Sequence, residues 1–151
     1  MKALQNAELV LIPNVGHNPH LEAPEIFNQE LIRFSRYDTQ RSIPCLADGL
    51  KPGQRKVLYG CFKRGLWKDP IKVLVLAGYV MEHVAYHHGD ASLHDTIIRM
   101  AQTFVGSNNI NLLFPAGQFG SRLGGGKDHA SPRYISTRLQ SIAETLFPAS
   151  D

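Results

Sequence analysis

The stretch Ile110–Arg122, with the sequence INLLFPAGQFGSR, determines which fold this chain is expected to adopt. Its first part, Ile110–Phe114, is mostly apolar and is typical of a buried strand. Pro115-Ala116-Gly117 follows as a turn, because proline presets one backbone torsion and glycine tolerates the conformations that turns require. Gln118–Arg122 then returns as a second strand, so the sequence predicts a β-hairpin.

Three amphipathic helices are predicted before this hairpin. The first covers about Gln54–Arg64 and the second about Val73–Tyr86. The third begins at Ser92, where Asp95 three residues later resembles a capping box. Three helices followed by a hairpin is the plan of a winged helix, in which a later helix can lie in or near a DNA groove. We therefore expect an α+β fold that is mainly helical, a helix-turn-helix with a β-hairpin wing.

Further elements are expected on either side of this core. The apolar run Ala7–Pro13 predicts a strand, and Pro24 is well placed to open a helix. The polar stretch Ser35–Ser42 breaks the apolar pattern of that helix, and residues 136–147 predict a final helix. Residues 1–35 are thus expected to form a strand-loop-helix appendage, and residues 36–148 the winged-helix module.

Length and composition fit one domain with an appendage. Of the 151 residues, 43% are hydrophobic and 19% are charged, which is enough apolar material for a core and too little charge for a disordered chain. The longest apolar stretch, Val73–Met81, is about half the length that a membrane-spanning helix needs, so no membrane partner is expected. Cys45 and Cys61 do not suggest a disulfide scaffold, which favours an intracellular, reducing compartment. Residues 36–151 are net basic, which is compatible with a polyanionic partner but also with an ordinary solvated surface.

A second informative stretch, Gly125–Ile135 with the sequence GGKDHASPRYI, places Tyr134 directly after Arg133. It lies just beyond a glycine-rich turn that carries Lys127. A phenol is a poor nucleophile at neutral pH, since its ordinary pKa is about 10. A tyrosine that attacks a phosphodiester therefore needs cations that hold the phosphate and favour the phenolate. The neighbours of Tyr134 are of that kind, although a single tyrosine is more often a half-buried anchor.

From Phe27 to Pro148 the chain resembles the eukaryotic type II DNA topoisomerases, enzymes that cut and reseal both strands of a duplex. The resemblance rests on motifs that occur in the same order along both sequences. These are FNQELI at 27–32, RSIP at 41–44, DGLKPGQRK at 48–56, YHHG at 86–89, FVGSNN at 104–109, GQFG at 117–120 and the run that ends in RYI. Such an ordered set is far more specific than any one of its motifs.

The resemblance implies a role for each matching position. Tyr134 would be the nucleophile that forms a 5′-phosphotyrosyl link, Arg133 would contact the scissile phosphate, and His88 would touch that phosphate or the leaving 3′-oxygen. Asp48 would orient the cations, and Gly89 would allow close approach. Double-stranded DNA would be held by a set of basic side chains: Arg41, Lys51, Arg55, Lys56, His87 and Lys127.

The resemblance also implies parts that lie elsewhere in the complete enzyme. The family holds divalent metal on an acidic cluster of a separate domain, and this sequence has no Asp-x-Asp cluster and no recognisable ATP-binding motif. No cofactor and no metal ligand are therefore expected in this chain, and Mg²⁺ and ATP are expected only for the complete enzyme. A homodimer in the full-length enzyme and a nuclear location follow from the same resemblance.

The first residues resemble a different family. Ala7–Glu25, AELVLIPNVGHNPHLEAPE, is similar to the final strand and catalytic-histidine loop of an α/β-hydrolase, in which His17 would activate a serine. No Gly-x-Ser-x-Gly elbow and no acid partner accompany it. The two resemblances meet at residues 27–32, and residues 27–35 fit either family. This pattern favours a chimeric or misjoined chain.

Three functions remain open on the sequence alone. The leading interpretation is a DNA-binding fragment of a type II topoisomerase that carries the nucleophilic tyrosine and is catalytically incomplete by itself. The alternatives are a non-enzymatic DNA-binding or interaction module with a vestigial tyrosine, and a hydrolase relic. Two departures from the family, Asp90 for a usual glutamate and Ser136 for an expected aromatic residue, leave the nucleophile and the main cations in place.

Overall fold

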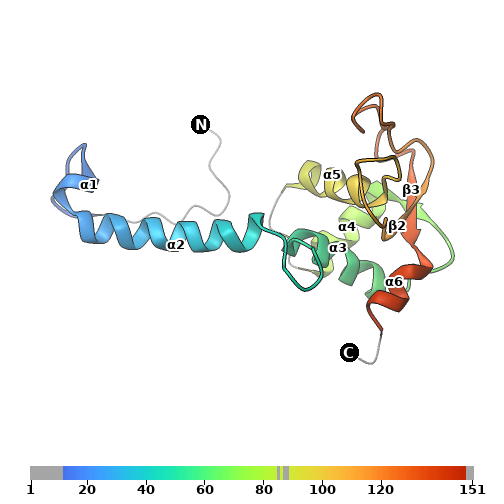
Figure 1. The fold of residues 1–151 in the computed structure, drawn as a ribbon, viewed down its shortest axis with the longest axis horizontal. Helices are drawn as coiled ribbons and strands as arrows, with labels where there is room; N and C mark the ends of the chain where they lie inside the picture. The colour runs from blue at the N-terminus through green and yellow to red at the C-terminus, as the bar shows by residue number, and fades with distance from the viewer. Residues whose placement is uncertain (1–11, 85, 87–88, 149–151) are drawn as a thin grey trace. The chain divides into compact units, whose positions relative to one another are not determined.

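A computed structural model describes residues 12–84, 86 and 89–148 (Figure 1). The chain divides into two compact units, unit 1 up to Pro52 and unit 2 from Gly53 onwards, and each is described by itself. The strand predicted at Ala7–Pro13 lies mostly outside the described residues. None of the helices in the described ranges is long and apolar enough to cross a membrane.

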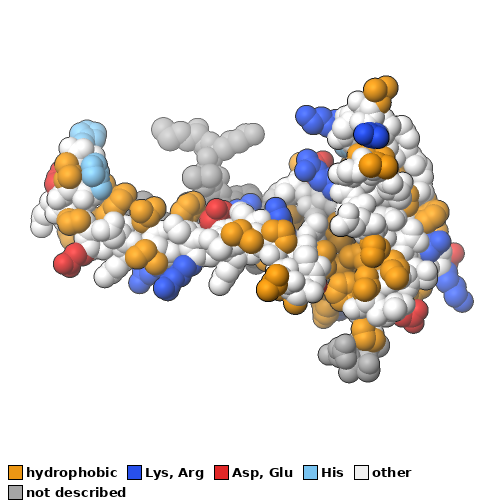
Figure 2. Space-filling view, viewed as in Figure 1, with side chains coloured by type: hydrophobic (Ala, Val, Ile, Leu, Met, Phe, Trp, Pro, Cys, Tyr) orange, Lys and Arg blue, Asp and Glu red, His pale blue; other side chains and the backbone are white. Residues whose placement is uncertain are grey.

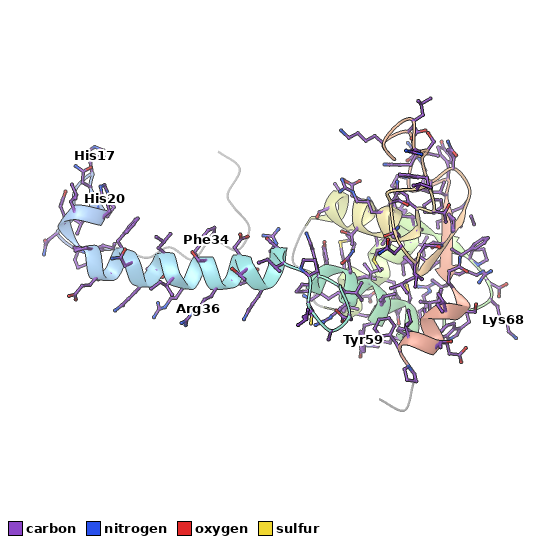
Figure 3. The ribbon with its side chains drawn as sticks, in the orientation of Figure 1. His17, His20, Phe34, Arg36, Tyr59 and Lys68 are labelled. Atoms are coloured by element: carbon purple, nitrogen blue, oxygen red, sulfur yellow. The ribbon has the colours of Figure 1, made fainter. Side chains whose placement is uncertain are left out.

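Unit 1 consists of a short helix, α1 (Pro19–Glu22), and a long one, α2 (Pro24–Ser42). Pro24 stands in the first turn of α2, as predicted. The break predicted at Ser35–Ser42 is wrong, because these polar residues include neither glycine nor proline and continue the helix. Figure 3 shows Phe34 and Arg36 on opposite sides of α2. Both residue 35, the proposed domain boundary, and residues 27–32, where the two resemblances meet, lie inside α2.

Unit 2 contains the three helices that the sequence predicts: α3 (Pro52–Lys63), α4 (Val73–His83) and α5 (Asp90–Ala101). The capping box predicted at Ser92 does not form, because α5 begins two residues earlier and Ser92 accepts a hydrogen bond from the Thr96 hydroxyl through its carbonyl oxygen. Apolar side chains at helical spacing form the core of the unit: Val57, Leu58, Cys61, Val73, Leu76, Ala77, Val80, Leu93, Ile97 and Ile98.

A small antiparallel sheet completes unit 2. It contains β1 (Ile71–Lys72), β2 (Leu113–Ala116) and β3 (Ser136–Leu139), in the order β1-β3-β2. The predicted α+β class with a three-helix core and a small β-wing is therefore confirmed, but the second strand of the predicted hairpin is wrong. No strand forms at Gln118–Arg122, and β2 pairs instead with β3, so that Leu113 faces Leu139.

The final helix is also shorter than predicted, since α6 covers only Ser141–Leu146. Residues 136–139 form β3 because burial there alternates, with Thr137 and Leu139 inside and their neighbours half-exposed. The segment that joins β2 to β3, residues 117–135, is hereafter the tyrosine loop. Figure 1 shows it at the upper end of unit 2, in orange to red-brown.

Candidate functional site

The turn that carries Tyr134 is fixed by backbone hydrogen bonds. The Tyr134 amide donates to the carbonyl oxygen of Ser131 across 2.8 Å, which closes a turn over Pro132. The amides of Val73 and Leu74, the first two residues of α4, donate to the carbonyl oxygens of Ile135 and Pro132 across 3.0 and 3.2 Å. Because the first amides of a helix have no partner within it, this turn satisfies two donors of α4 that would otherwise be unpaired.

The side chains of Tyr134 and Ile135 point in opposite directions. Ile135 is 1% exposed, whereas Tyr134 is 67% exposed. Gly117 packs against Ile135, and its φ of +123° and the 2.9 Å from an added Cβ to Ile135 Cγ2 both require glycine. The buried Ile135 anchors the turn, so the Tyr134 phenol projects from a fixed backbone into solvent.

Arg133 lies beside this phenol, as the sequence suggests. Its guanidinium carbon is 5.3 Å from the centroid of the Tyr134 ring, and its side chain is exposed. A cation at this distance is attracted to the face of the ring. The two side chains together offer a nucleophile and a bidentate phosphate ligand on one exposed turn.

The glycine-rich part of the tyrosine loop holds Lys127. The carboxylate of Asp128 accepts hydrogen bonds from the Ser121 amide (2.8 Å) and the Ser121 hydroxyl (2.6 Å), which closes this part of the loop. The hydrogen bond from the Ser121 side chain is the main cause that lowers the pKa of Asp128, followed by the one from the Ser121 amide. The Lys127 side chain is exposed. Figure 2 shows Lys and Arg side chains over the upper end of unit 2, where Figure 1 draws this loop.

Gln102, directly after α5, supports the loop from below. The sequence places Gln102 on the polar face of the third helix, yet it is only 7% exposed. Its side-chain nitrogen donates to the carbonyl oxygens of Phe119 (2.9 Å) and Gly126 (3.0 Å). An open cleft of about 590 Å³ lies alongside, lined by groups that include Arg99, Asn108, Lys127 and His129.

The other predicted residues of unit 2 lie on the helices. Arg55 is exposed and Lys56 is half-buried on α3, and Gly89 stands exposed at the N-cap of α5. His87 and His88 lie outside the described residues, so their predicted roles stay predictions.

The remaining predicted residues belong to unit 1. Arg41 is exposed in the last turn of α2, and Lys51 is exposed in the segment that follows. Asp48 is half-buried, and its carboxylate accepts a hydrogen bond from the Leu50 amide across 2.9 Å. Their approach to Tyr134, which is part of unit 2, stays a prediction.

A metal site is not visible among the described side chains. No group of three or more His, Cys, Asp or Glu residues in those ranges could hold an ion. The described residues therefore do not fit the divalent metal that the family resemblance implies for the complete enzyme.

Comparison with known proteins is consistent over most of the chain. Residues 41–151 match the family described as DNA gyrase/topoisomerase IV. The chain belongs to the type II DNA topoisomerases. DNA topoisomerase 2-beta of Mus musculus is 62% identical over 132 residues, which are 87% of this chain and 8% of that protein. DNA topoisomerase 2 of Plasmodium falciparum (isolate K1 / Thailand) is 62% identical over 128 residues, or 84% of this chain and 9% of that protein.

A solved topoisomerase structure has the same fold. The DNA-binding, cleavage and re-ligation domain of Plasmodium falciparum topoisomerase II matches with a TM-score of 0.76 and 64% identity, over 81% of this chain and 17% of that chain. The chain thus spans less than a tenth of the length of its curated topoisomerase relatives. The resemblance of the first residues to the α/β-hydrolases is not borne out by these comparisons.

Two residues of the topoisomerase site were missed by sequence reasoning, Gln102 and Lys72. The ammonium of Lys72 donates a hydrogen bond to the carbonyl oxygen of Tyr134 across 2.9 Å. The only sequence signal for Gln102 was its position at the end of a predicted helix. Lys72 gave none, because an exposed lysine in a short strand resembles any solvated lysine.

Proposed function

We propose that this chain is part of the DNA gate of a type II topoisomerase, and that Tyr134 is the nucleophile of its strand cleavage. The observation that carries the proposal is the geometry of Tyr134, an exposed phenol on a hydrogen-bonded turn beside the Arg133 guanidinium. A nucleophile needs both features, because the substrate must reach it and its direction must be fixed.

In the proposed reaction, Tyr134 Oη forms a bond to the phosphorus of a DNA phosphodiester, and the bond from phosphorus to the deoxyribose 3′-oxygen breaks. The phenolic proton passes to a base or to solvent, and the 3′-oxygen takes up a proton. One phosphodiester replaces another, so the reverse step reseals the strand. Arg133 would stabilise the charge that develops on the phosphoryl oxygens.

Double-stranded DNA is the proposed partner. Lys127 and Arg133 are exposed cations of the tyrosine loop and are suited to phosphate contacts, which position a duplex without reading its sequence. Arg41, Lys51, Arg55, Lys56, His87 and His88 are proposed to complete the DNA contacts in the intact enzyme. There we also propose a homodimer, a nuclear location, and Mg²⁺ and ATP as cofactors, with no step above assigned to either.

The test is a covalent adduct in a chimera. This chain replaces its counterpart in the Plasmodium falciparum domain, and the chimera is incubated with a nicked duplex and Mg²⁺ before denaturing electrophoresis. We expect a protein–DNA adduct with the native chain and none with Tyr134→Phe. Tyr59→Phe is the matched control, since Tyr59 is a 56% exposed tyrosine of α3 and should leave the adduct unchanged.

An adduct that persists in Tyr134→Phe would exclude Tyr134 as the nucleophile. No adduct at all, combined with duplex binding that falls steeply with salt, would instead identify a non-enzymatic DNA-binding module.

A further inference from the structure

Lys72 is linked to Tyr134 although 62 positions separate them in the sequence. Its ammonium donates to the Tyr134 carbonyl oxygen across 2.9 Å. Lys72 lies in β1, where its Cα pairs with that of Ser136, two residues beyond Tyr134. The backbone pairing therefore aligns β1 with the start of β3, and the lysine side chain reaches back to the residue that bears the phenol.

Three consecutive residues thus hold the turn. Lys72 binds the carbonyl of Tyr134, Val73 that of Ile135, and Leu74 that of Pro132. The contacts of Val73 and Leu74 use backbone amides, which almost any side chain would preserve. The contact of Lys72 is the one that depends on residue type.

The same contacts exclude another role for this region. The positive end of a helix dipole commonly binds phosphate through its free amides. The first two amides of α4 are already used by Ile135 and Pro132, so this helix end supports the turn instead.

We propose that Lys72 is a positioning residue for the Tyr134 nucleophile; the inference rests on the proposed function. The exposed Tyr134 side chain has few neighbours to orient it, so its direction follows the backbone of its own residue. A charged donor on the Tyr134 carbonyl restricts the rotation of that peptide group and so fixes where Cβ points. Small displacements of a reacting group slow a reaction strongly, because attack requires close and aligned atoms.

The test compares three variants. Lys72→Met keeps the length of the side chain and removes its charge, and Lys72→Arg keeps both charge and donors. Lys68→Met is the control, since Lys68 is an exposed lysine of the same segment, and Figure 3 shows it pointing away from unit 2. Three quantities are measured: duplex affinity as a function of salt, the rate of adduct formation at saturating duplex in the chimera, and hydrogen exchange of the Tyr134 amide in the intact chain.

We expect Lys72→Met to slow adduct formation at saturating duplex by about tenfold or more. The Tyr134 amide should exchange faster, and the dissociation constant for duplex should stay within about twofold. Lys72→Arg should recover most of the rate and the protection, which a merely structural loss of the strand would not allow. Lys68→Met should match the native chain in all three measurements.

Two results would overturn the inference. If Lys72→Met weakens duplex binding and lowers the salt slope by about one while the saturated rate is unchanged, Lys72 is a phosphate contact. If Tyr134 amide exchange is unchanged, the turn does not depend on Lys72. A native chimera without any adduct would refute the proposed function instead, and amide exchange would still decide whether Lys72 fixes the turn.

Discussion

The side-chain nitrogen of Gln102 lies 3.0 Å from the carbonyl oxygen of Gly126 and joins the end of α5 to the glycine-rich part of the tyrosine loop. The same nitrogen also donates to Phe119, and all three residues are buried. A single buried amide therefore satisfies two loop carbonyls, one of them next to Lys127.

Replacing Gln102 with leucine should destabilise unit 2 strongly. Leucine has a similar size but leaves the carbonyls of Phe119 and Gly126 buried without this partner. We expect the free energy of unfolding to fall by about 2–4 kcal/mol, since each unsatisfied buried group costs about 1–3 kcal/mol. Urea denaturation measures the change. Gln118→Leu is the control, because Gln118 is exposed; equal effects of the two variants would contradict the assigned role of Gln102.

Two neighbouring glycines separate backbone strain from close packing. Gly125 and Gly126 both have positive φ, +58° and +77°, but an added Cβ meets nothing within 4 Å at Gly125. At Gly126 the same atom would lie 2.6 Å from Gln102 Nε2. Gly125→Ala should therefore cost about 1–2 kcal/mol from the left-handed backbone alone, and Gly126→Ala about 1–3 kcal/mol more from overpacking. Thermal unfolding of both variants tests this, and a smaller loss for Gly126→Ala would refute the packing.

The helices of unit 2 could be predicted because their cores repeat at helical spacing. Val57, Leu58 and Cys61 mark α3 in this way, and each of them is buried. The strand β3 could not be predicted by the same rule. Leu139, Ile142 and Leu146 continue a helical pattern, and a four-residue strand is too short to interrupt it. The pairing of β3 with β2 across residues 117–135 is a long-range contact that no local pattern reports.

The candidate site divides along the same line. Arg133 and Tyr134 are adjacent in the chain, so their proximity could be predicted. Lys72 and Gln102 reach the tyrosine loop through tertiary contacts, and their polarity resembles that of ordinary surface residues. The local sequence thus identifies the reacting group and the folded chain adds the residues that hold it.

The hydrogen bonds between Ser121 and Asp128 should make the loop sensitive to acid. They lower the pKa of Asp128, so their contribution to stability is complete above the unfolded pKa of about 3.9 and is lost as pH falls through the lower, folded value. Ser121→Ala should raise the pKa of Asp128 toward its ordinary value, as measured by carbon NMR of the carboxyl group. The stability difference from the native chain should be constant near neutral pH and narrow below about pH 4. Ser131→Ala, at another exposed serine of the loop, should leave the Asp128 titration unchanged.

The two cysteines should differ in reactivity. Cys61 is 0% exposed, and burial raises its pKa to about 12, whereas Cys45 is exposed. Since only the thiolate reacts, a thiol reagent at pH 8 should modify one cysteine quickly and the second only in denaturant. Cys45→Ser should abolish the fast reaction. Two fast thiols in the folded chain would show that the core around α3 opens readily.

Arg133 should contribute more to the chemistry than its charge alone. Its guanidinium lies over the Tyr134 ring and can bind two phosphate oxygens at once, which a lysine cannot. Arg133→Ala should lower the slope of duplex affinity against salt by about one phosphate contact and slow adduct formation by about 100-fold or more. Arg133→Lys should restore the salt slope and recover little of the rate, because charge returns without the planar pair of donors. If lysine restored both, Arg133 would act as a simple cation, and the fixed pairing of guanidinium and phenol would have no part in cleavage.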